Sequence, residues 1–160
     1  MSLDSVRASL GDRSGDILVF DRSSATVLEA AEAAGVPPER IAKTLGFYGL
    51  EPDTAILVVV AGDAKLNSGD FKRRFGLKAR MLGADDVERL TGHAIGGVCP
   101  FANPDGATVY LDESLRRFET VLPAAGSSNS AIEVTLAQLE ELGGSAGWVD
   151  VCRGWRPEEI

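Results

Sequence analysis

The sequence predicts a single α+β domain built on a mixed β-sheet, and three observations lead to that fold class. Many strand-like segments are interrupted by irregularly placed helices, which disfavours a repeated βαβ pattern. Residues 55–61 (AILVVVA) are apolar on both faces, which is typical of a central strand. No low-complexity linker or internal repeat divides the 160 residues, of which 44% are hydrophobic and 25% charged. We therefore expect one domain over residues 1–160.

The elements of the first half follow from apolar patterns and helix-end signals. Ser23 or Ser24 offers an N-cap oxygen to a helix that Gly35 ends. Ser68 is the expected cap of a further short helix. The apolar run at 17–20 predicts a buried strand, and 41–50 alternates as a strand does. The predicted helices span 2–10, 24–34, 68–75 and 84–90, and the predicted strands span 17–20, 41–50, 55–61 and 79–82.

In the second half of the chain, the residue composition changes after Gly92. Residues 93–101 mix glycines, apolar residues and a proline, which predicts a loop or a bulged strand. Asp112 is placed to cap the short helix that follows it. The remaining predicted strands span 107–111, 120–124, 131–134 and 148–151, and the remaining predicted helices span 113–117 and 136–142.

Charge and composition exclude several classes of function. The net charge of −8 disfavours a sequence-independent duplex binder, which needs clustered lysine and arginine. The longest apolar run, residues 55–61, is far shorter than the ~20 residues of a membrane span. The N-terminal segment has no apolar core, which disfavours a signal peptide. We expect a cytoplasmic protein with no membrane partner.

Cysteine and histidine usage limits the chemistry further. Cys99 and Cys152 lie far apart in the sequence and form no CxxC pair, so we expect two free thiols rather than a disulfide. His93 is the single histidine, and no spacing typical of metal ligands surrounds it. We therefore expect no metal and no cofactor.

Lys43 is the first residue that could carry chemistry. It lies within an apolar strand pattern, where a lysine either extends its amine to solvent or faces an anionic group. In the second case it would bind a phosphate or a carboxylate. The basic cluster from Lys72 to Arg80 has two similar alternatives, a solvated helix face or a small phosphate contact.

Two segments of small residues could form a binding loop. Residues 96–100 (GGVCP) combine two glycines, which let backbone N–H groups approach a ligand, with a proline that fixes the exit of the loop. Residues 125–129 (AGSSN) combine small side chains with hydrogen-bond donors. An ordinary turn is the alternative for each segment. His93 and Cys99 are either structural or, as a pair, the base and nucleophile of a hydrolase.

The order of these motifs resembles the YbaK/ProX family. The resemblance is carried by RIAKTLGF, AILVVVAGDAKLN, RLTGHAIGGVCPF, TVYLDESL and VLPAAGSSNSAIEVTLAQLEEL, and it covers about residues 24–151. The family comprises free-standing relatives of the editing domain that is inserted in bacterial prolyl-tRNA synthetases. It implies a curved, partly barrel-like mixed sheet surrounded by helices.

The resemblance implies an aminoacyl-tRNA deacylase, which hydrolyses the ester between a wrong small amino acid (Ala, Cys, Ser or Thr) and a tRNA. Lys43 matches the family's lysine that contacts the terminal nucleotide, and the backbone at Gly96 and Gly97 matches the loop that positions the ester carbonyl. A ribose hydroxyl of the substrate helps to activate water, and neither a metal nor a covalent protein nucleophile is implied. The implied substrate-binding residues are His93, Val98, Cys99, Pro100, Gly126, Ser127 and Ser128.

The implied partner is the 3′ acceptor end of an aminoacyl-tRNA. Because the chain is acidic, a synthetase or an elongation factor that delivers the tRNA is a further expected partner. Lys65 and the run Lys72–Arg74 are candidate contacts to the tRNA backbone. Two departures from the family stand out: His93 replaces a common aromatic residue, and Ser128-Asn129 replaces a histidine that some members carry. The alternative function is a non-catalytic module that binds an aminoacyl-nucleotide-like ligand or a synthetase.

Overall fold

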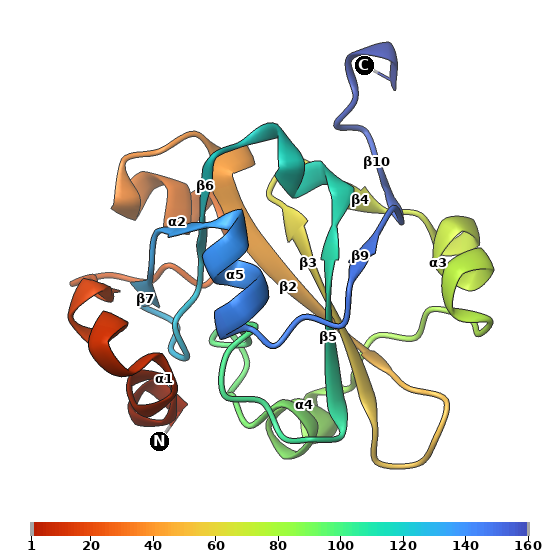
Figure 1. The fold of residues 1–160 in the computed structure, drawn as a ribbon, viewed down its shortest axis with the longest axis horizontal. Helices are drawn as coiled ribbons and strands as arrows, with labels where there is room; N and C mark the ends of the chain where they lie inside the picture. The colour runs from red at the N-terminus through yellow and green to blue at the C-terminus, as the bar shows by residue number, and fades with distance from the viewer. Residues whose placement is uncertain (1, 160) are drawn as a thin grey trace.

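A curved, half-barrel β-sheet forms the centre of the protein, in a computed structural model that describes residues 2–159 (Figure 1). The strands are β1 (Leu18–Val19), β2 (Ile41–Tyr48), β3 (Ala55–Ala61), β4 (Lys65–Leu66), β5 (Ala107–Asp112), β6 (Thr120–Pro123), β7 (Ser130–Ala131), β8 (Val134–Thr135), β9 (Trp148–Val149) and β10 (Cys152–Arg153). Six of them form the main sheet in the order β8-β6-β2-β3-β5-β9. The pairs β2–β3 and β6–β8 are antiparallel, whereas β2–β6, β3–β5 and β5–β9 are parallel.

Five α-helices surround this sheet in the described part of the chain (Figure 1). They are α1 (Ser2–Leu10), α2 (Val27–Ala34), α3 (Ser68–Phe75), α4 (Ala84–Thr91) and α5 (Leu136–Leu142). Short 3₁₀ helices complete the connections: η1 (Gly11–Asp16), η2 (Pro38–Arg40), η3 (Glu113–Arg117) and η4 (Pro157–Glu159). The mixed sheet with irregularly ordered helices confirms the predicted α+β class.

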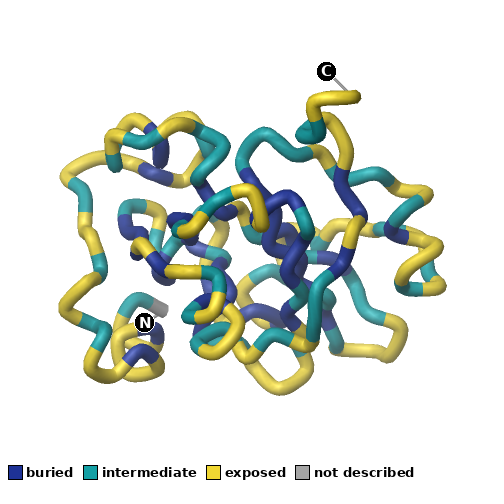
Figure 2. Tube along the Cα trace, turned by 45° about the horizontal axis from the view of Figure 1, so that its top comes forward, coloured by how far each residue is buried: buried dark blue, intermediate teal, exposed yellow. Residues whose placement is uncertain are grey.

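The core lies on both faces of β3. Leu57, Val58, Val59 and Val60 are all essentially inaccessible to solvent, so the strand is central as its sequence predicted. Figure 2 shows this buried chain at the centre of the molecule, with exposed loops around it. Because successive side chains of a strand point to opposite faces, a run without polar residues can be buried only between two layers.

One face of the sheet packs against α1, α4, α5 and η3. Val6, Leu90, Leu115 and Leu139, one from each of these helices, belong to the same apolar cluster as Leu57 and Val59 of β3. This layer also holds the buried residues Cys99 and Phe101. The loop from residue 93 to 101 therefore lies on the same face of the sheet as these four helices.

The other face of the sheet is covered in two separate places. Ile41 of β2 packs with Ala30 and Ala31 of α2, whereas Leu45 of β2 belongs to the cluster around Phe71 of α3. Lys43 lies between Ile41 and Leu45 on this same face, and it is exposed. The lysine thus occupies the uncovered stretch of β2 between two apolar contacts.

Two helix N-caps differ from the sequence predictions by one to three residues. Thr26, rather than Ser23 or Ser24, caps α2, in a capping box with Glu29. Asn67, rather than Ser68, caps α3 by accepting from the Asp70 N–H at 2.9 Å. In both helices the residue that acts as the cap is the one whose side-chain oxygen can accept a hydrogen bond from the N–H of the third helical residue. Asp112 caps η3 as predicted, since it accepts from the Ser114 N–H.

Several predicted strands are shorter than expected, including 148–151, of which only Trp148–Val149 forms a strand. The segment 17–20, expected to be buried, forms only β1, where Leu18 and Val19 are 44% and 52% exposed. The segment 79–82 makes a single bridge between Met81 and Phe47. The segment 131–134 is divided between β7 and β8. Each contains apolar residues, yet only one or two residues at a time form ladder pairs.

Cys99 and Cys152 are both free and buried, which confirms two thiols. No helix within residues 2–159 is long and apolar enough to cross a membrane. Within the same residues, no three His, Cys, Asp or Glu side chains gather as metal ligands would.

Candidate functional site

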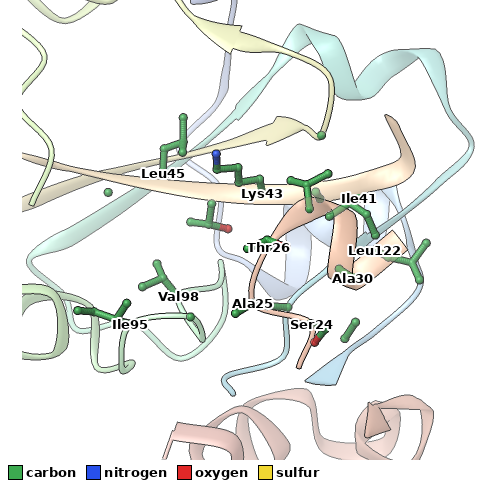
Figure 3. A pocket seen from close by; sticks show the side chains of 18 of the residues that line it. Ser24, Ala25, Thr26, Ala30, Ile41, Lys43, Leu45, Ile95, Val98 and Leu122 are labelled. Carbon is green, nitrogen blue, oxygen red and sulfur yellow. The ribbon is translucent and has the colours of Figure 1, made fainter. Parts of the chain in front are cut away.

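A cavity of about 750 Å³ opens along one edge of β2. Its walls come from the start of α2, from the segment around Met81 and Leu82, and from the loop around Ile95 and Val98. Figure 3 shows Val98 and Ile95 on the opposite side of the cavity from Lys43 and Leu45. The lining is mostly apolar, as is common for sites that bind a small molecule or one end of a larger one.

The edge of β2 that faces the cavity is unpaired at Thr44. Alternate residues of this strand aim their backbone groups at this edge, as the Leu82 N–H to Gly46 C=O and Tyr48 N–H to Arg80 C=O hydrogen bonds show. At the N-terminal end of β2, the strand β6 pairs only with Ile41 and Ala42. Thr44 lies between these two paired stretches, and its N–H and C=O have no partner within residues 2–159.

The side chain of Thr44 is also without a hydrogen bond. Its hydroxyl oxygen is buried and has no partner, although the residue as a whole is only half-buried and lines the cavity. The accessible part of Thr44 therefore lies in its methyl group and its backbone.

Lys43 stands at the same edge with its amine exposed (Figure 3). It makes no ion pair with any residue of the described chain. All of the nearby lining is uncharged, so Lys43 is the single formal charge on the cavity wall in the part of the chain described. An anion that enters the cavity would meet this one cation.

In the loop opposite β2, one backbone N–H group is hydrogen-bonded within the loop and two others are free, within the described chain, to bind a ligand. The Gly97 N–H donates to the Ala94 C=O at 2.9 Å, which closes a turn. Gly96 adopts a φ of 90°, a conformation that favours glycine. The N–H groups of Gly96 and Val98 have no partner in the described chain, and both residues line the cavity. These two, and not Gly97, are therefore the donors left for a ligand.

The loop at 126–129 supports this loop from behind. Gly97 approaches it so closely that a Cβ on Gly97 would lie 3.0 Å from the Gly126 carbonyl carbon and from the Ser127 Cα. The Ser128 carbonyl accepts from the Ser24 N–H at 2.7 Å, which ties the loop to the start of the α2 segment. Asn129 donates from its side chain to the Phe20 carbonyl. Neither Ser127 nor Ser128 lines the cavity.

A buried polar cluster closes the base of the loop from 93 to 101. The His93 Nε2 lies 2.7 Å from the Phe101 carbonyl oxygen, and the Thr91 hydroxyl accepts from the His93 N–H. Cys99 lies 3.4 Å from the same ring nitrogen. His93 and Cys99 are fully buried and outside the cavity wall, so the structure places them beneath the loop.

The geometry of this cluster determines its protonation. A carbonyl oxygen can only accept, so the His93 Nε2 carries the proton that it donates to Phe101. That nitrogen therefore has no lone pair to take a proton from Cys99. Burial lowers the pKa of His93 and raises the pKa of Cys99 to about 12, so both are neutral near pH 7. A thiolate nucleophile does not form in this arrangement.

The structure brings some of the sequence-predicted site residues together and separates others. Lys43, Gly96 and Val98 line the cavity. Gly97 and Gly126 pack behind the loop, and Pro100 is buried beside Gly143.

Most of the cavity wall was not predicted from the sequence, and examples are Leu28, Thr44, Met81 and Ile95. Three of them, Leu28, Met81 and Ile95, are 61–72% exposed. Large exposed apolar side chains mark these three in the structure, whereas their exposure cannot be read from the sequence.

A basic strip extends from the Met81 wall of the cavity. It consists of Lys72, Arg74, Lys78 and Arg80, all exposed and without an ion pair inside residues 2–159. Arg74 lies over the rings of Phe75 and Tyr110, and Arg80 lies over that of Tyr48. Residues 64–80 contain six basic residues and one acidic residue, so this stretch carries +5 in a chain of net −8.

Comparisons with known proteins agree with this architecture. Residues 21–142 match the model of the aminoacyl-tRNA editing domain. The uncharacterized protein YwhH of Bacillus subtilis (strain 168) is 52% identical over 157 residues, which cover 97% of this chain and 99% of that protein.

Two solved structures are similar over most of their length. One, of a candidate trans-editing enzyme for prolyl-tRNA synthetase, superposes with a TM-score of 0.83 at 32% identity and covers 96% of this chain and 98% of that one. The other, of the hypothetical protein APE2540, has a TM-score of 0.76 at 31% identity and covers 86% of this chain and 90% of that one.

Proposed function

This chain belongs to the aminoacyl-tRNA editing domain family, and on that premise we propose that it is a deacylase that hydrolyses mischarged aminoacyl-tRNA. The observation that carries the proposal is the cavity itself. One wall offers the exposed amine of Lys43, and the opposite wall offers the unpartnered N–H groups of Gly96 and Val98. An aminoacyl ester on a nucleotide needs a partner for its phosphate and donors for its carbonyl, and the cavity supplies both.

The reaction is the hydrolysis of one ester bond. The oxygen of water attacks the acyl carbon, the bond from that carbon to the ribose oxygen breaks, and the ribose oxygen takes up a proton that the water gives up. The products are the free amino acid and a tRNA with a free terminal hydroxyl. The neighbouring ribose hydroxyl of the substrate orients the water. The described cavity wall has no carboxylate or imidazole, so a base from the substrate fits this site.

The loop from 96 to 98 stabilises the developing oxyanion. Gly96 and Val98 have free N–H groups on the cavity wall, and Gly97 positions them because its own N–H holds the turn. Fixed backbone donors need no reorganisation during the reaction, and the loss of one such donor costs about 10²–10³ in kcat. Positioning of the ester accounts for further acceleration without any covalent step.

Lys43 binds the terminal phosphate or the developing negative charge. Its amine is exposed and has no ion pair in the described chain, so it is available without breaking an internal contact. The flanking residues Ile41 and Leu45 are packed, which fixes the strand that carries it. A compact ammonium group suits a phosphate oxygen as a point charge.

The size and lining of the cavity fit a small acyl group on a terminal nucleoside. About 750 Å³ lies within the range of ligand sites and exceeds what a small amino acid needs alone. Leu82, Val87 and Val98 form an apolar part of its wall. Such a wall admits small side chains and excludes larger ones, as sieve editing requires.

The basic strip gives the acidic protein a path for the tRNA backbone. It begins at Arg80, directly before the cavity residue Met81, and continues through Lys78 to α3. Helix-dipole stabilisation explains cations in the last turn of α3. It does not explain Lys78 and Arg80, which lie beyond the helix. On the other side of Met81, α4 begins with Asp85 and Asp86 and limits the strip.

Neither alternative function has a supporting observation of its own. A cysteine hydrolase needs a thiolate, whereas Cys99 is buried, protonated and without a base. A non-catalytic binding module would use the same cavity, so only activity separates it from the deacylase.

Deacylation of a tRNA panel tests the proposal. Purified protein is incubated with Ala-, Cys-, Ser-, Thr- and Pro-tRNA, and release of each amino acid is measured against its uncatalysed rate. We expect accelerated release of at least one small amino acid. If a folded sample accelerates none of the five, the deacylase proposal fails and the binding module takes its place.

A further inference from the structure

We propose that the aminoacyl group binds as a single-residue β-strand on the unpaired edge of β2 at Thr44. The Thr44 C=O accepts a hydrogen bond from the α-ammonium group of the substrate, and the Thr44 N–H donates to its acyl carbonyl. This assignment rests on the proposed function and adds to it the group of the substrate that is recognised.

The shape of the unpaired edge leaves room for one residue. Strand edges are normally paired or covered, because they present rows of free N–H and C=O groups. Here β6 pairs with the edge up to Ala42, and the segment 80–82 pairs with the Gly46 C=O and the Tyr48 N–H. Between these contacts, Thr44 is the residue whose N–H and C=O both lack a partner in the described chain, and it lines the cavity.

This opening matches an aminoacyl ester in its hydrogen-bonding groups. In an antiparallel ladder, a hydrogen-bonded pair of residues exchanges two bonds, each residue giving its N–H to the other's C=O. An aminoacyl group carries an N–H donor and a carbonyl acceptor on either side of one α-carbon, as a peptide residue does. It can therefore complete the pair at Thr44 as an added strand would.

The surroundings of the docked group suit its side chain and its carbonyl. Opposite residues of a hydrogen-bonded pair place their side chains on the same face. On the Thr44 face, Leu82 packs over Gly46, since a Cβ on Gly46 would lie 3.0 Å from the Leu82 Cδ1. The substrate side chain then meets Leu82 and the neighbouring Val98 wall. One lone pair of the carbonyl oxygen accepts from the Thr44 N–H, and the second is left for an N–H group of the 96–98 loop.

The pairing also predicts that the site prefers one configuration at the α-carbon of the aminoacyl group. With the two hydrogen bonds fixed, an L-aminoacyl group directs its side chain to the Thr44 face. A D-aminoacyl group would direct it to the opposite face, towards Lys43 and Leu45. The site therefore distinguishes the two enantiomers through backbone contacts.

Binding of stable analogues tests the inference separately from catalysis. The probe is 3′-(L-alanylamino)-3′-deoxyadenosine, whose amide resists hydrolysis, and the comparison is its lactyl counterpart, with hydroxyl in place of ammonium. We expect the Thr44 amide resonance to shift on titration with the alanyl probe, and the lactyl probe to bind about 10-fold or more weakly, since hydrogen bonds to charged groups are the stronger ones. The D-alanyl probe is expected to bind more weakly by a similar factor.

Thr44→Val provides the matched variant. It removes the unpartnered hydroxyl and keeps the backbone, so the ratio between the alanyl and lactyl probes should be retained. Equal binding of the two probes, an unmoved Thr44 amide, or loss of the ratio in Thr44→Val would each overturn the inference. Selective binding without ester hydrolysis in the tRNA panel would instead refute the deacylase and leave the ammonium site in place.

Discussion

Gly97 and Gly126 touch backbone to backbone: a Cβ on Gly97 would lie 3.0 Å from both the carbonyl carbon and the carbonyl oxygen of Gly126. Real Cβ atoms rarely approach other atoms so closely, and here the neighbours are main-chain atoms with little freedom to move. The contact sets how far the loop at 96–98 stands from β2. It therefore sets the position of the Gly96 and Val98 donors.

Gly97→Ala is expected to push these two loops apart. The donors would move away from the ester carbonyl, so kcat/KM should fall by about 10-fold or more. Overpacking should also lower the free energy of unfolding by roughly 1–3 kcal/mol. Gly15→Ala is the control, because a Cβ there meets nothing within 4 Å. Equal activity of the two variants would contradict the role of the contact.

His93 should make the free energy of unfolding decrease as the pH falls below neutrality. Burial lowers its pKa from the ordinary 6.5, so below about pH 6.5 the unfolded chain gains a proton that the folded chain does not. The stabilisation is complete above that pH and is lost as the pH decreases, by up to about 1.4 kcal/mol per pH unit. Thermal unfolding between pH 7.5 and 5 measures it. In His93→Gln the decrease should be smaller, and parallel curves for both proteins would refute this assignment.

Cys99→Ala should retain activity within about twofold. The thiol is buried, its pKa is raised to about 12, and the neighbouring His93 nitrogen already donates to Phe101. The wild-type thiol should also resist iodoacetamide until the protein unfolds. A loss of more than 100-fold in kcat, with an unchanged unfolding curve, would restore the cysteine-hydrolase mechanism.

The basic strip should matter for long substrates and not for short ones. Replacing Lys72, Lys78 and Arg80 with glutamine should lower kcat/KM on aminoacyl-tRNA and leave that on an aminoacyl-CCA trinucleotide unchanged. The slope of log kcat/KM against log salt should become shallower by about 0.7–0.9 for each phosphate that the variant no longer neutralises. Arg7→Gln is the control, because Arg7 is exposed, unpaired in residues 2–159 and remote in sequence. Equal losses on both substrates would rule out a backbone path.

The sequence was most informative where local pattern and burial coincide. The run Ala55–Ala61 could only be a central strand, and the strand, turn and helix signals around Ile41 and Phe71 predicted β2 and α3 closely. Lys43 was found because one charge in an apolar alternation is conspicuous. The glycine loop was found for a similar reason, since paired glycines before a proline are uncommon in regular structure.

The sequence could not reveal features that depend on where other elements end. Thr44 is open because β6 stops at Pro123 and the 80–82 segment pairs only near Phe47, and neither limit can be read from residues 41–48. The strand predicted at 17–20 was expected to be buried, but it forms only the exposed strand β1, whose partner β7 is two residues long. Nor could the sequence show that the Gly97 N–H is unavailable to a ligand because it donates to the Ala94 C=O within a turn.

The proposed function depends most on Lys43 acting on an ester in this cavity. The most direct measurement is the initial rate of amino-acid release by wild type and Lys43→Ala, on the tRNA that the wild type deacylates fastest. Because Lys43 is exposed and makes no ion pair in the described chain, the variant should unfold at the same temperature and lose about 10²-fold or more in kcat/KM. Arg7→Ala, which removes another exposed cation, should remain active. A Lys43→Ala protein as active as the wild type would contradict the role of this lysine.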